Sequence, residues 1–229
     1  MTITCHKDLV QGSEEWLAAR CGLLTASEMH LIVTPTLKPA SNEKVRSHLY
    51  ELLAQRITGY VEPRYISDDM LRGMDDEITA RALYAKTYAP VKECGFITND
   101  KWGFTIGYSP DALVGDDGAL ECKSRSQKWQ VRTLVDYGPD DQIDPDFVIQ
   151  VQTGLLVSER KWIDLVSYCG GLPMITVRVY PDERTQTAII EAASGFEKRL
   201  AEKKATFDAM ELSYGRLIPT ERKIIQEIY

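Results

Sequence analysis

Residues 109–124 read SPDALVGDDGALECKS and predict a β-hairpin that carries two acids and a lysine. The GDDG at 115–118 has the turn chemistry of a hairpin loop, because Asp-Gly pairs adopt the backbone angles that such loops need. The flanking segments, DALV and ALECKS, are short and rich in strand-forming residues. Side chains alternate along a strand, so Glu121 and Lys123 share one face and Cys122 lies on the other.

The pairing register of this hairpin decides whether Asp111 joins them. A loop over residues 114–118 places Asp111 directly opposite Glu121, with side chains about 5 Å apart. A two-residue turn at 116–117 places Asp111 on the opposite face instead, unless a bulge near Pro110 restores the pairing. The sequence leaves both registers open.

A metal site is one explanation of this charge pattern. Two carboxylates held close together repel each other unless a cation lies between them. Mg²⁺ suits such a pair, because it binds through one or two carboxylates and keeps several waters. A neighbouring lysine can orient or deprotonate a water that the metal has made more acidic, which describes attack on a phosphodiester. On spacing alone, a charged surface hairpin is the commoner explanation.

The composition indicates one globular domain over residues 1–229 of a soluble, cytoplasmic protein. The chain is 44% hydrophobic, and it has no apolar run near the roughly 18 residues that cross a membrane. Five scattered cysteines without a Cys-x-x-Cys pair, and only three histidines, argue against a zinc or disulfide framework. The net charge of −7 argues weakly against nucleic acid, yet a binding groove needs only a local excess such as Lys123, Arg125, Lys128 and Arg132.

Periodicity predicts an α/β fold with a central mixed β-sheet flanked by α-helices. Helices are expected at 14–20, 26–33, 42–59, 67–89, 126–135, from 145 onward and at 183–212. Strands are expected within 91–98, 103–109, 111–114, 119–124, 162–168 and 174–180. In the 67–89 helix, Leu71, Met74, Ile78 and Ala82 form an apolar stripe, the face that such a helix usually buries.

Four residues outside the hairpin are further candidates. Glu77 flanks the apolar stripe of the 67–89 helix. On the sequence, it is equally compatible with a functional site and with an ordinary exposed position. Gln152 interrupts a buried stripe, so its amide needs partners, either backbone groups, the commoner case, or a substrate phosphate. Arg20 and Ser27 border a helix N-terminus, which is a natural anion site, although each is more often an ordinary surface or first-turn residue.

Four blocks, in order, resemble the phage lambda exonuclease family (YqaJ-like viral recombinases) of the PD-(D/E)XK nuclease superfamily. The resemblance covers about residues 14–168 and implies the restriction-endonuclease-like fold, with a central mixed sheet and flanking helices. The blocks are WLAARCGLLTASE at 16–28, RGMDDE at 72–77, SPDALVGDDGALECK at 109–123 and FVIQVQTGLL at 147–156.

The resemblance also implies roles for individual residues. Asp111 and Glu121 would bind one or two Mg²⁺ ions, for which Mn²⁺ substitutes, with help from the backbone carbonyl of Cys122. Lys123 would position and activate the attacking water, and Glu77 would complete the metal and water shell. The residues implied to hold a terminal 5′-phosphate are Arg20, Ser27, Ser109 and Gln152.

The activity implied by the resemblance is processive 5′→3′ digestion of one strand of duplex DNA to mononucleotides, leaving a 3′ overhang. The resemblance further implies a ring-shaped homotrimer that works with a single-strand annealing recombinase, in bacteria or in phage-infected cells. Two alternatives stay open on the sequence. One is an endonuclease or branch-specific resolvase of the same superfamily, and the other is a DNA-end binding protein without catalysis.

Overall fold

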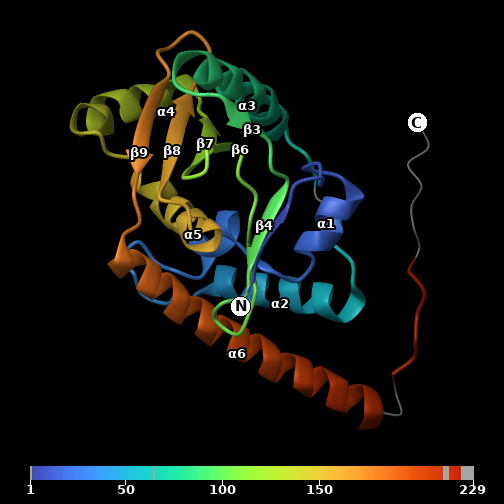
Figure 1. The fold of residues 1–229 in the computed structure, drawn as a ribbon. Helices are drawn as coiled ribbons and strands as arrows, with labels where there is room; N and C mark the ends of the chain where they lie inside the picture. The colour runs from blue at the N-terminus through green and yellow to red at the C-terminus, as the bar shows by residue number, and fades with distance from the viewer. Residues whose placement is uncertain (1, 64, 214–216, 223–229) are drawn as a thin grey trace.

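The computed structural model describes residues 2–63, 65–213 and 217–222 of the chain (Figure 1). Its α-helices are α1 (Glu14–Arg20), α2 (Glu43–Thr58), α3 (Asp68–Thr87), α4 (Gln127–Arg132), α5 (Val148–Ser158) and α6 (Glu183–Ser213). Its strands are β1 (Ile3–His6), β2 (Leu24–Thr25), β3 (Val91–Lys92), β4 (Phe96–Asn99), β5 (Ile106–Tyr108), β6 (Ala112–Val114), β7 (Gly118–Ser124), β8 (Trp162–Tyr168) and β9 (Ile175–Val179). No helix within the described ranges combines the length and apolar composition needed to cross a bilayer.

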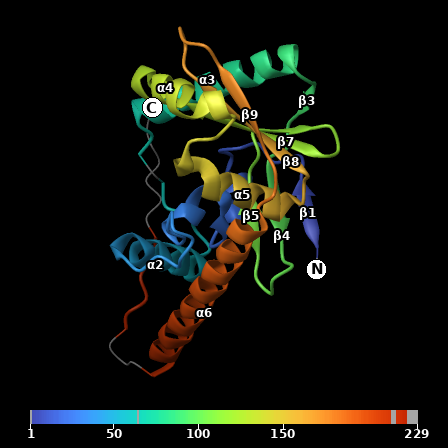
Figure 2. The same cartoon turned by 90° about the vertical axis from the view of Figure 1, so that its left-hand side faces the viewer.

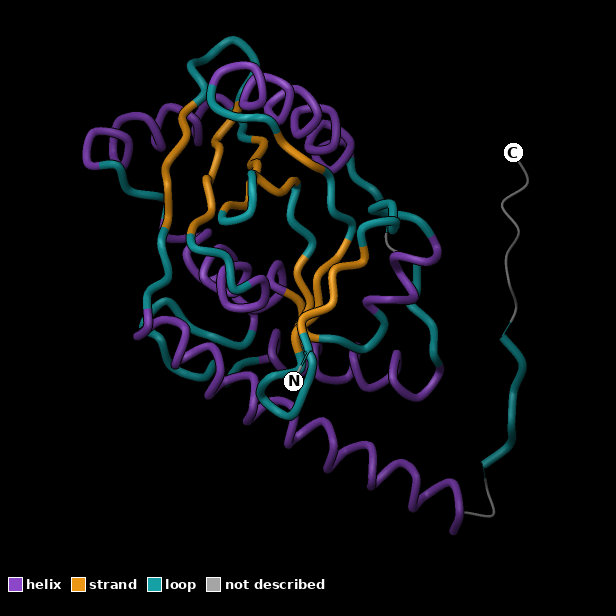
Figure 3. Tube along the Cα trace, in the orientation of Figure 1, coloured by secondary structure: helices purple, strands orange, loops and turns teal. Residues whose placement is uncertain are grey.

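The mixed α/β architecture predicted from the sequence is confirmed, with the strands divided between two mixed sheets (Figure 3). One sheet has the order β1-β4-β5-β2, and the other has the order β3-β6-β7-β8-β9. Each sheet contains one parallel pair, β2 with β5 and β7 with β8. The short strands β1 and β2 were not expected, because neither has enough residues to show a period in the sequence.

The chain crosses from one sheet to the other at Ser109, Pro110 and Asp111. Strand β5, before this point, belongs to the four-stranded sheet, and strand β6, after it, begins the hairpin in the five-stranded sheet. Proline has no backbone N–H to give to a ladder, so Pro110 suits a break between two sheets. Ser109 and Asp111 therefore lie on either side of the junction.

The hairpin takes the register with the longer loop. Ala112 pairs with Leu120 and Val114 with Gly118, which leaves residues 115–117 in the loop, and Gly115 has a positive φ of 55°. The N–H of Asp111 donates to the Leu120 carbonyl at 3.1 Å, so the pairing extends past the end of β6. This register places Asp111 opposite Glu121.

Helices cover both faces of the five-stranded sheet (Figure 2). On one face, Ala80 and Tyr84 of α3 belong to a buried cluster with Leu120 and Cys122 of β7. On the other face, α5 contacts β8 and contributes to the larger core, which α2 and α6 extend. The alternation along β7 therefore turns Cys122 toward α3 and Glu121 and Lys123 toward α5.

The predicted buried face of α3 is wrong. Leu71 and Met74 are each 51% exposed and Ile78 is 58% exposed, whereas Ala80 and Tyr84 are fully buried. A polar contact helps to fix which face of α3 is buried: the Tyr84 hydroxyl donates to the buried Asp164 carboxylate. This bond gives the buried Asp164 carboxylate a partner, and a buried polar group left without one would cost about 1–3 kcal/mol.

Residues 26–33 also depart from the expected α-helix. They form the 3₁₀ helix η1 (Ala26–Leu31), and no side-chain cap closes its N-terminus. Thr25-Ala-Ser-Glu28 matches a capping box in sequence, which was the basis for expecting an α-helix here. In the structure the Thr25 hydroxyl instead donates to the Glu28 carboxylate at 2.9 Å. The remaining short helical segments are η2 (Thr133–Tyr137, a π-helix), η3 (Gly138–Asp140) and η4 (Pro145–Phe147).

Candidate functional site

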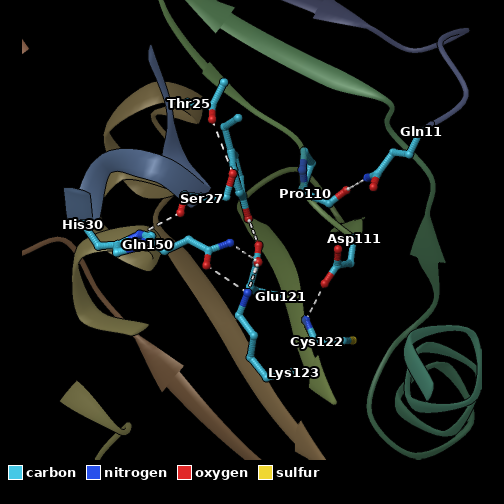
Figure 4. A network of polar contacts seen from close by, with 11 residues as sticks. Gln11, Thr25, Ser27, His30, Pro110, Asp111, Glu121, Cys122, Lys123 and Gln150 are labelled. Carbon is cyan, nitrogen blue, oxygen red and sulfur yellow. Dashed lines mark hydrogen bonds and ion pairs between the residues drawn. The ribbon is translucent and has the colours of Figure 1, made fainter. Parts of the chain in front are cut away.

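The two acids of the hairpin are both buried and both held by neighbouring groups (Figure 4). Asp111 is 9% exposed, and its carboxylate accepts the backbone N–H of Cys122. Glu121 is 3% exposed, and its Oε2 accepts the Tyr108 hydroxyl at 3.1 Å. The cross-strand register and these bonds hold the two carboxylates as neighbours in a setting with little water.

Lys123 closes the polar network from the same strand. Its Nζ lies 2.8 Å from Glu121 Oε1 and 2.9 Å from Gln150 Oε1. The Gln150 amide nitrogen in turn donates to Glu121 Oε1 (Figure 4). Gln150, on α5, was not a candidate from the sequence, because it lies off the buried stripe of that helix. Its place in the FVIQVQTGLL block at 147–156 was a signal that could have found it.

Several carboxylates lie close to one another and to Lys123 at this site, and they shift each other's pKa values. Burial, then the Glu121 and Glu77 carboxylates, raises the pKa of Asp111 well above its ordinary value. Burial alone would lower the pKa of Lys123, but Glu121 and Asp111 outweigh it and raise the pKa. The site thus contains more negative charge than its own residues neutralise.

Glu77 approaches the hairpin from α3. Its carboxylate pairs with Arg81 at 3.5 Å, and Arg81 also donates to the backbone carbonyl of Asp111 at 3.0 Å. Burial raises the pKa of Glu77, Arg81 partly offsets this effect, and Glu121 raises the pKa further. Glu77 is therefore close enough to interact with Glu121 of β7 and with Asp111, and it is not a solvated surface glutamate.

The donor set of this site fits a hard divalent cation. Carboxylates of Asp111 and Glu121, with the carbonyl of Cys122 as a further oxygen, are the ligands that Mg²⁺ prefers. After burial, the Glu121 and Glu77 carboxylates contribute to the raised pKa of Asp111, and a bound cation would relieve this like-charge repulsion. Elsewhere in the described part of the chain, Glu28, His48 and Glu51 place possible ligand atoms within 4.8 Å of one another, but an imidazole nitrogen suits Mg²⁺ less well.

A second cluster, which we call the anchor cluster, consists of Trp16, Arg20, Thr25, Ser27 and Ser109. The Arg20 guanidinium donates to Ser109 Oγ at 3.1 Å and to Thr25 Oγ1 at 3.3 Å. Thr25 Oγ1 lies 3.3 Å from Ser27 Oγ, and the Trp16 indole donates to Ser109 Oγ at 3.1 Å. The structure thus brings together three of the four residues implied to hold a phosphate. Trp16 and Thr25 were not among those candidates.

Gln152, the fourth residue of that set, is not part of this cluster. Its amide nitrogen donates to the Tyr180 carbonyl at 2.8 Å, and its Oε1 accepts the Asp182 N–H at 2.9 Å. Both partners are backbone groups of the connection from β9 to α6. Two residues along an α-helix are about 200° apart, so Gln152 points away from the face on which Gln150 lies. In this structure the Gln152 amide thus has the backbone partners that were the commoner expectation for it, and it lies outside the anchor cluster.

The sequence profile of the YqaJ-like viral recombinase domain matches residues 15–161, more than half of the chain. The chain belongs to the YqaJ-like viral recombinase family. This match confirms the family predicted from the four sequence blocks. No curated protein matches the chain.

Solved structures place this YqaJ-like protein beside exonucleases. It is similar to the alkaline exonuclease LHK-Exo from Laribacter hongkongensis, with 30% identity and a TM-score of 0.75 over 88% of this chain and 100% of that chain. The complex of LHK-Exo with dAMP gives a TM-score of 0.76 at the same identity and coverage. A phage-related exonuclease from Haemophilus somnus 129PT shares the fold, with 16% identity and a TM-score of 0.61 over 81% of this chain and 96% of that chain.

Proposed function

We propose that this chain is a Mg²⁺-dependent 5′→3′ exonuclease that digests one strand of duplex DNA to mononucleotides and leaves a 3′ overhang. The family and the similarity to LHK-Exo support a nuclease that acts on DNA. The observation that carries the proposal is the hairpin, where Asp111 and Glu121 lie opposite each other and Lys123 contacts Glu121 at 2.8 Å.

The proposed mechanism gives each of these residues one task. Asp111 and Glu121, with the Cys122 carbonyl, would hold Mg²⁺, and Glu77 would orient a water beside them. When bound, the metal would lower the pKa of that water and stabilise charge on the leaving oxygen. If Asp111 and Glu121 held a cation, the two charges that raise the Lys123 pKa would be offset, and the Lys123 Nζ would then be able to accept a proton from the attacking water. Gln150 and Tyr108 keep the Glu121 carboxylate in place.

The anchor cluster would bind the terminal 5′-phosphate. A guanidinium with hydroxyls on either side is a good ligand for a phosphate, because both donate charge-assisted hydrogen bonds to it. Ser109 is only two residues before Asp111, so a phosphate held at Ser109 would place the first phosphodiester near the hairpin acids. Release of a mononucleotide follows from this spacing, and the dAMP complex of LHK-Exo supports such a product.

We further propose that residues 1–229 form a single nuclease domain that assembles into a ring-shaped homotrimer around DNA. Its partners would be duplex DNA ends and a single-strand annealing recombinase, in the cytoplasm of a bacterium or of a phage-infected cell. Membership of a viral recombinase family supports the recombination role. A ring would also let an acidic exterior coexist with a channel that includes Arg125 and Lys128.

The deciding experiment compares a linear duplex, 5′-phosphorylated on one strand, with a covalently closed circle, each incubated with Mg²⁺ or with EDTA. We expect loss of the phosphorylated strand alone, as mononucleotides and only with Mg²⁺. A cut circle would favour the endonuclease or resolvase and would overturn the anchor cluster as an end-binding site. No cleavage of either DNA would favour an end-binding protein without catalysis.

The same assay tests Lys123. We expect Lys123→Ala to abolish cleavage while binding of DNA ends survives, because the anchor cluster does not include this lysine. Lys101→Ala is the matched control, since Lys101 is exposed and pairs with Glu159 at 2.9 Å instead of with the hairpin acids. Cleavage by Lys123→Ala at the rate of the Lys101→Ala protein would contradict the assignment.

A further inference from the structure

Two cysteines that are distant in the sequence have their thiols in contact. Cys5 of β1 and Cys94, just before β4, are 89 residues apart, and their Sγ atoms lie 3.0 Å from each other. Cys94 is 3% exposed, whereas Cys5 is half-buried. A disulfide needs the sulfurs at about 2.05 Å, so the two thiols need to approach by only about 1 Å.

The backbone beside these thiols is tightly packed. Strand β1 pairs with β4 in antiparallel register, which brings the two segments together. A side chain at Gly95 would place its Cβ 1.9 Å from the Leu9 carbonyl oxygen, so the chain after β1 lies directly against the chain after Cys94. The contact between the sulfurs is therefore set by the fold and not by two mobile side chains.

The cysteine pair is also connected to the anchor cluster. The Gly95 carbonyl, next in the chain after Cys94, accepts the Trp16 indole N–H at 3.1 Å. The same N–H donates to Ser109 Oγ, and the Arg20 guanidinium lies 4.2 Å from the centre of the Trp16 ring. A shift of the backbone at Cys94 would thus act on Trp16 and, through it, on Arg20 and Ser109.

We propose that Cys5 and Cys94 are an oxidative modification site: peroxide converts them to a reversible intramolecular disulfide that alters the anchor cluster. Disulfides in cytosolic proteins are usually transient and redox-sensing, which agrees with a thiol pair of this kind. The effect on the anchor cluster rests on the function proposed above, but formation of the disulfide does not.

The chemistry balances with one equivalent of hydrogen peroxide. The half-exposed Cys5 sulfur attacks a peroxide oxygen, the O–O bond breaks, and Cys5 sulfenic acid and one water form. The Cys94 sulfur then attacks the Cys5 sulfur, the S–S bond forms, Cys94 gives up its proton, and the hydroxyl leaves as a second water. Burial and the neighbouring Cys5 thiol raise the pKa of Cys94 to about 12, so Cys94 is the second and not the first sulfur to react.

The test is a thiol map of the full chain after hydrogen peroxide treatment, alkylation under unfolding conditions, digestion without reductant and mass spectrometry. We expect a linked peptide pair containing Cys5 and Cys94, reversal by dithiothreitol, and alkylated thiols at Cys21, Cys122 and Cys169. We also expect the melting temperature of the oxidised protein to rise by about 10 °C, because a long loop is closed. A Cys94 that stays a thiol while Cys5 becomes sulfinic acid would overturn the proposal.

Matched variants separate the modification from its consequence. Cys5→Ser should prevent the linked peptide, and Cys21→Ser, which alters another half-buried cysteine, should leave it unchanged. Peroxide should lower the rate of wild-type protein on 5′-phosphorylated ends several-fold, reversibly, with no such loss in Cys5→Ser. If the disulfide forms and the rate is unchanged, the coupling to the anchor cluster is wrong. If the reduced protein does not cleave DNA, the proposed function fails and the thiol map still decides the modification.

Discussion

At the scale of single residues, the hairpin acids are placed at a cost to folding. Asp111 is buried beside Glu121 and near Glu77, and both the burial and the like charges oppose its ionisation. A carboxylate kept in such a place has no structural advantage over an amide of the same shape. The arrangement is typical of a site where stability is lost for the sake of function.

The pH dependence of stability follows from the raised pKa of Asp111. The folded chain binds the proton of this group more tightly than the unfolded chain, so folding is favoured at a pH below the ordinary aspartate pKa of 3.8. This contribution is lost as the pH rises through the raised pKa of the folded state. An asparagine side chain does not titrate and can still accept the Cys122 N–H. The Asp111→Asn protein should therefore not lose this stability as the pH rises.

We therefore predict that, in EDTA, the melting temperature of Asp111→Asn exceeds that of the wild type by an amount that grows between pH 4 and pH 8. Millimolar Mg²⁺ should raise the melting temperature of the wild type at pH 8, because a ligand that binds only the folded state stabilises it. The same addition should leave Asp111→Asn nearly unchanged. A melting difference independent of pH, or equal stabilisation of both proteins by Mg²⁺, would count against the metal site.

At the scale of elements, helix α5 presents two glutamines on different faces, where they contact different parts of the fold. Gln150 faces β7 and bonds both Glu121 and Lys123, while Gln152 faces the connection from β9 to α6. One helix thus supplies a site residue and a structural residue two positions apart. The pair tests whether the polar network at the hairpin matters for catalysis.

We predict opposite effects from the two alanine variants. Gln150→Ala should lower the cleavage rate about 10- to 100-fold, as loss of a partner of a metal-binding residue does, with little change in stability. Gln152→Ala should leave the Tyr180 carbonyl and the Asp182 N–H unpaired and cost about 1–3 kcal/mol of unfolding free energy. Initial rates and urea unfolding of both proteins measure the two effects. A slow but fully stable Gln152→Ala protein would instead return Gln152 to the substrate site.

Helix α3 shows how tertiary contacts can override a hydrophobic period. The sequence predicts its ends closely, because Ser67 is an N-cap whose side chain accepts the Met70 N–H. Its rotation depends on polar partners elsewhere: Tyr84 bonds Asp164, and Ser124 of β7 donates to Asp76. These partners are distant in the sequence, so no local pattern contains them. The expectation that the apolar stripe of α3 is its buried face was therefore wrong.

At the scale of the whole molecule, the exposed face of α3 and the distribution of charge are the features that bear on the proposed assembly. Leu71, Met74 and Ile78 are each more than half exposed along one helix face, and apolar surface of this kind is typical of contact with another macromolecule. The chain has a net charge of −7, although Arg125, Lys128 and Arg132 surround the half-exposed Trp129. In the proposed ring, Lys128 and Arg132 would keep DNA near a basic surface, whereas Arg125 is largely buried and pairs with Asp144 at 2.8 Å.

We predict that sedimentation equilibrium gives a mass three times that of the 25.9 kDa chain at micromolar concentration. Digestion of a long duplex should then continue after an excess of unlabelled DNA is added, since an enclosed substrate does not exchange. A mass of one chain together with full processivity would exclude the ring as its cause.

The sequence by itself determined the α/β class, the boundaries of most elements and the family. It also identified the residues of the hairpin, because caps, turns and alternation are local signals that the chain carries with it. As a set, Arg20, Ser27 and Ser109 of the anchor cluster were anticipated only through the resemblance to the family, because they belong to the short blocks that carry it.

Only the tertiary structure decided the register that places Asp111 opposite Glu121, the contact of Gln150 with Glu121, the rotation of α3 and the contact between Cys5 and Cys94. Each of these depends on groups from separate elements that pack together. Their free energies come from burial and from pairing of buried polar atoms, which no local pattern encodes.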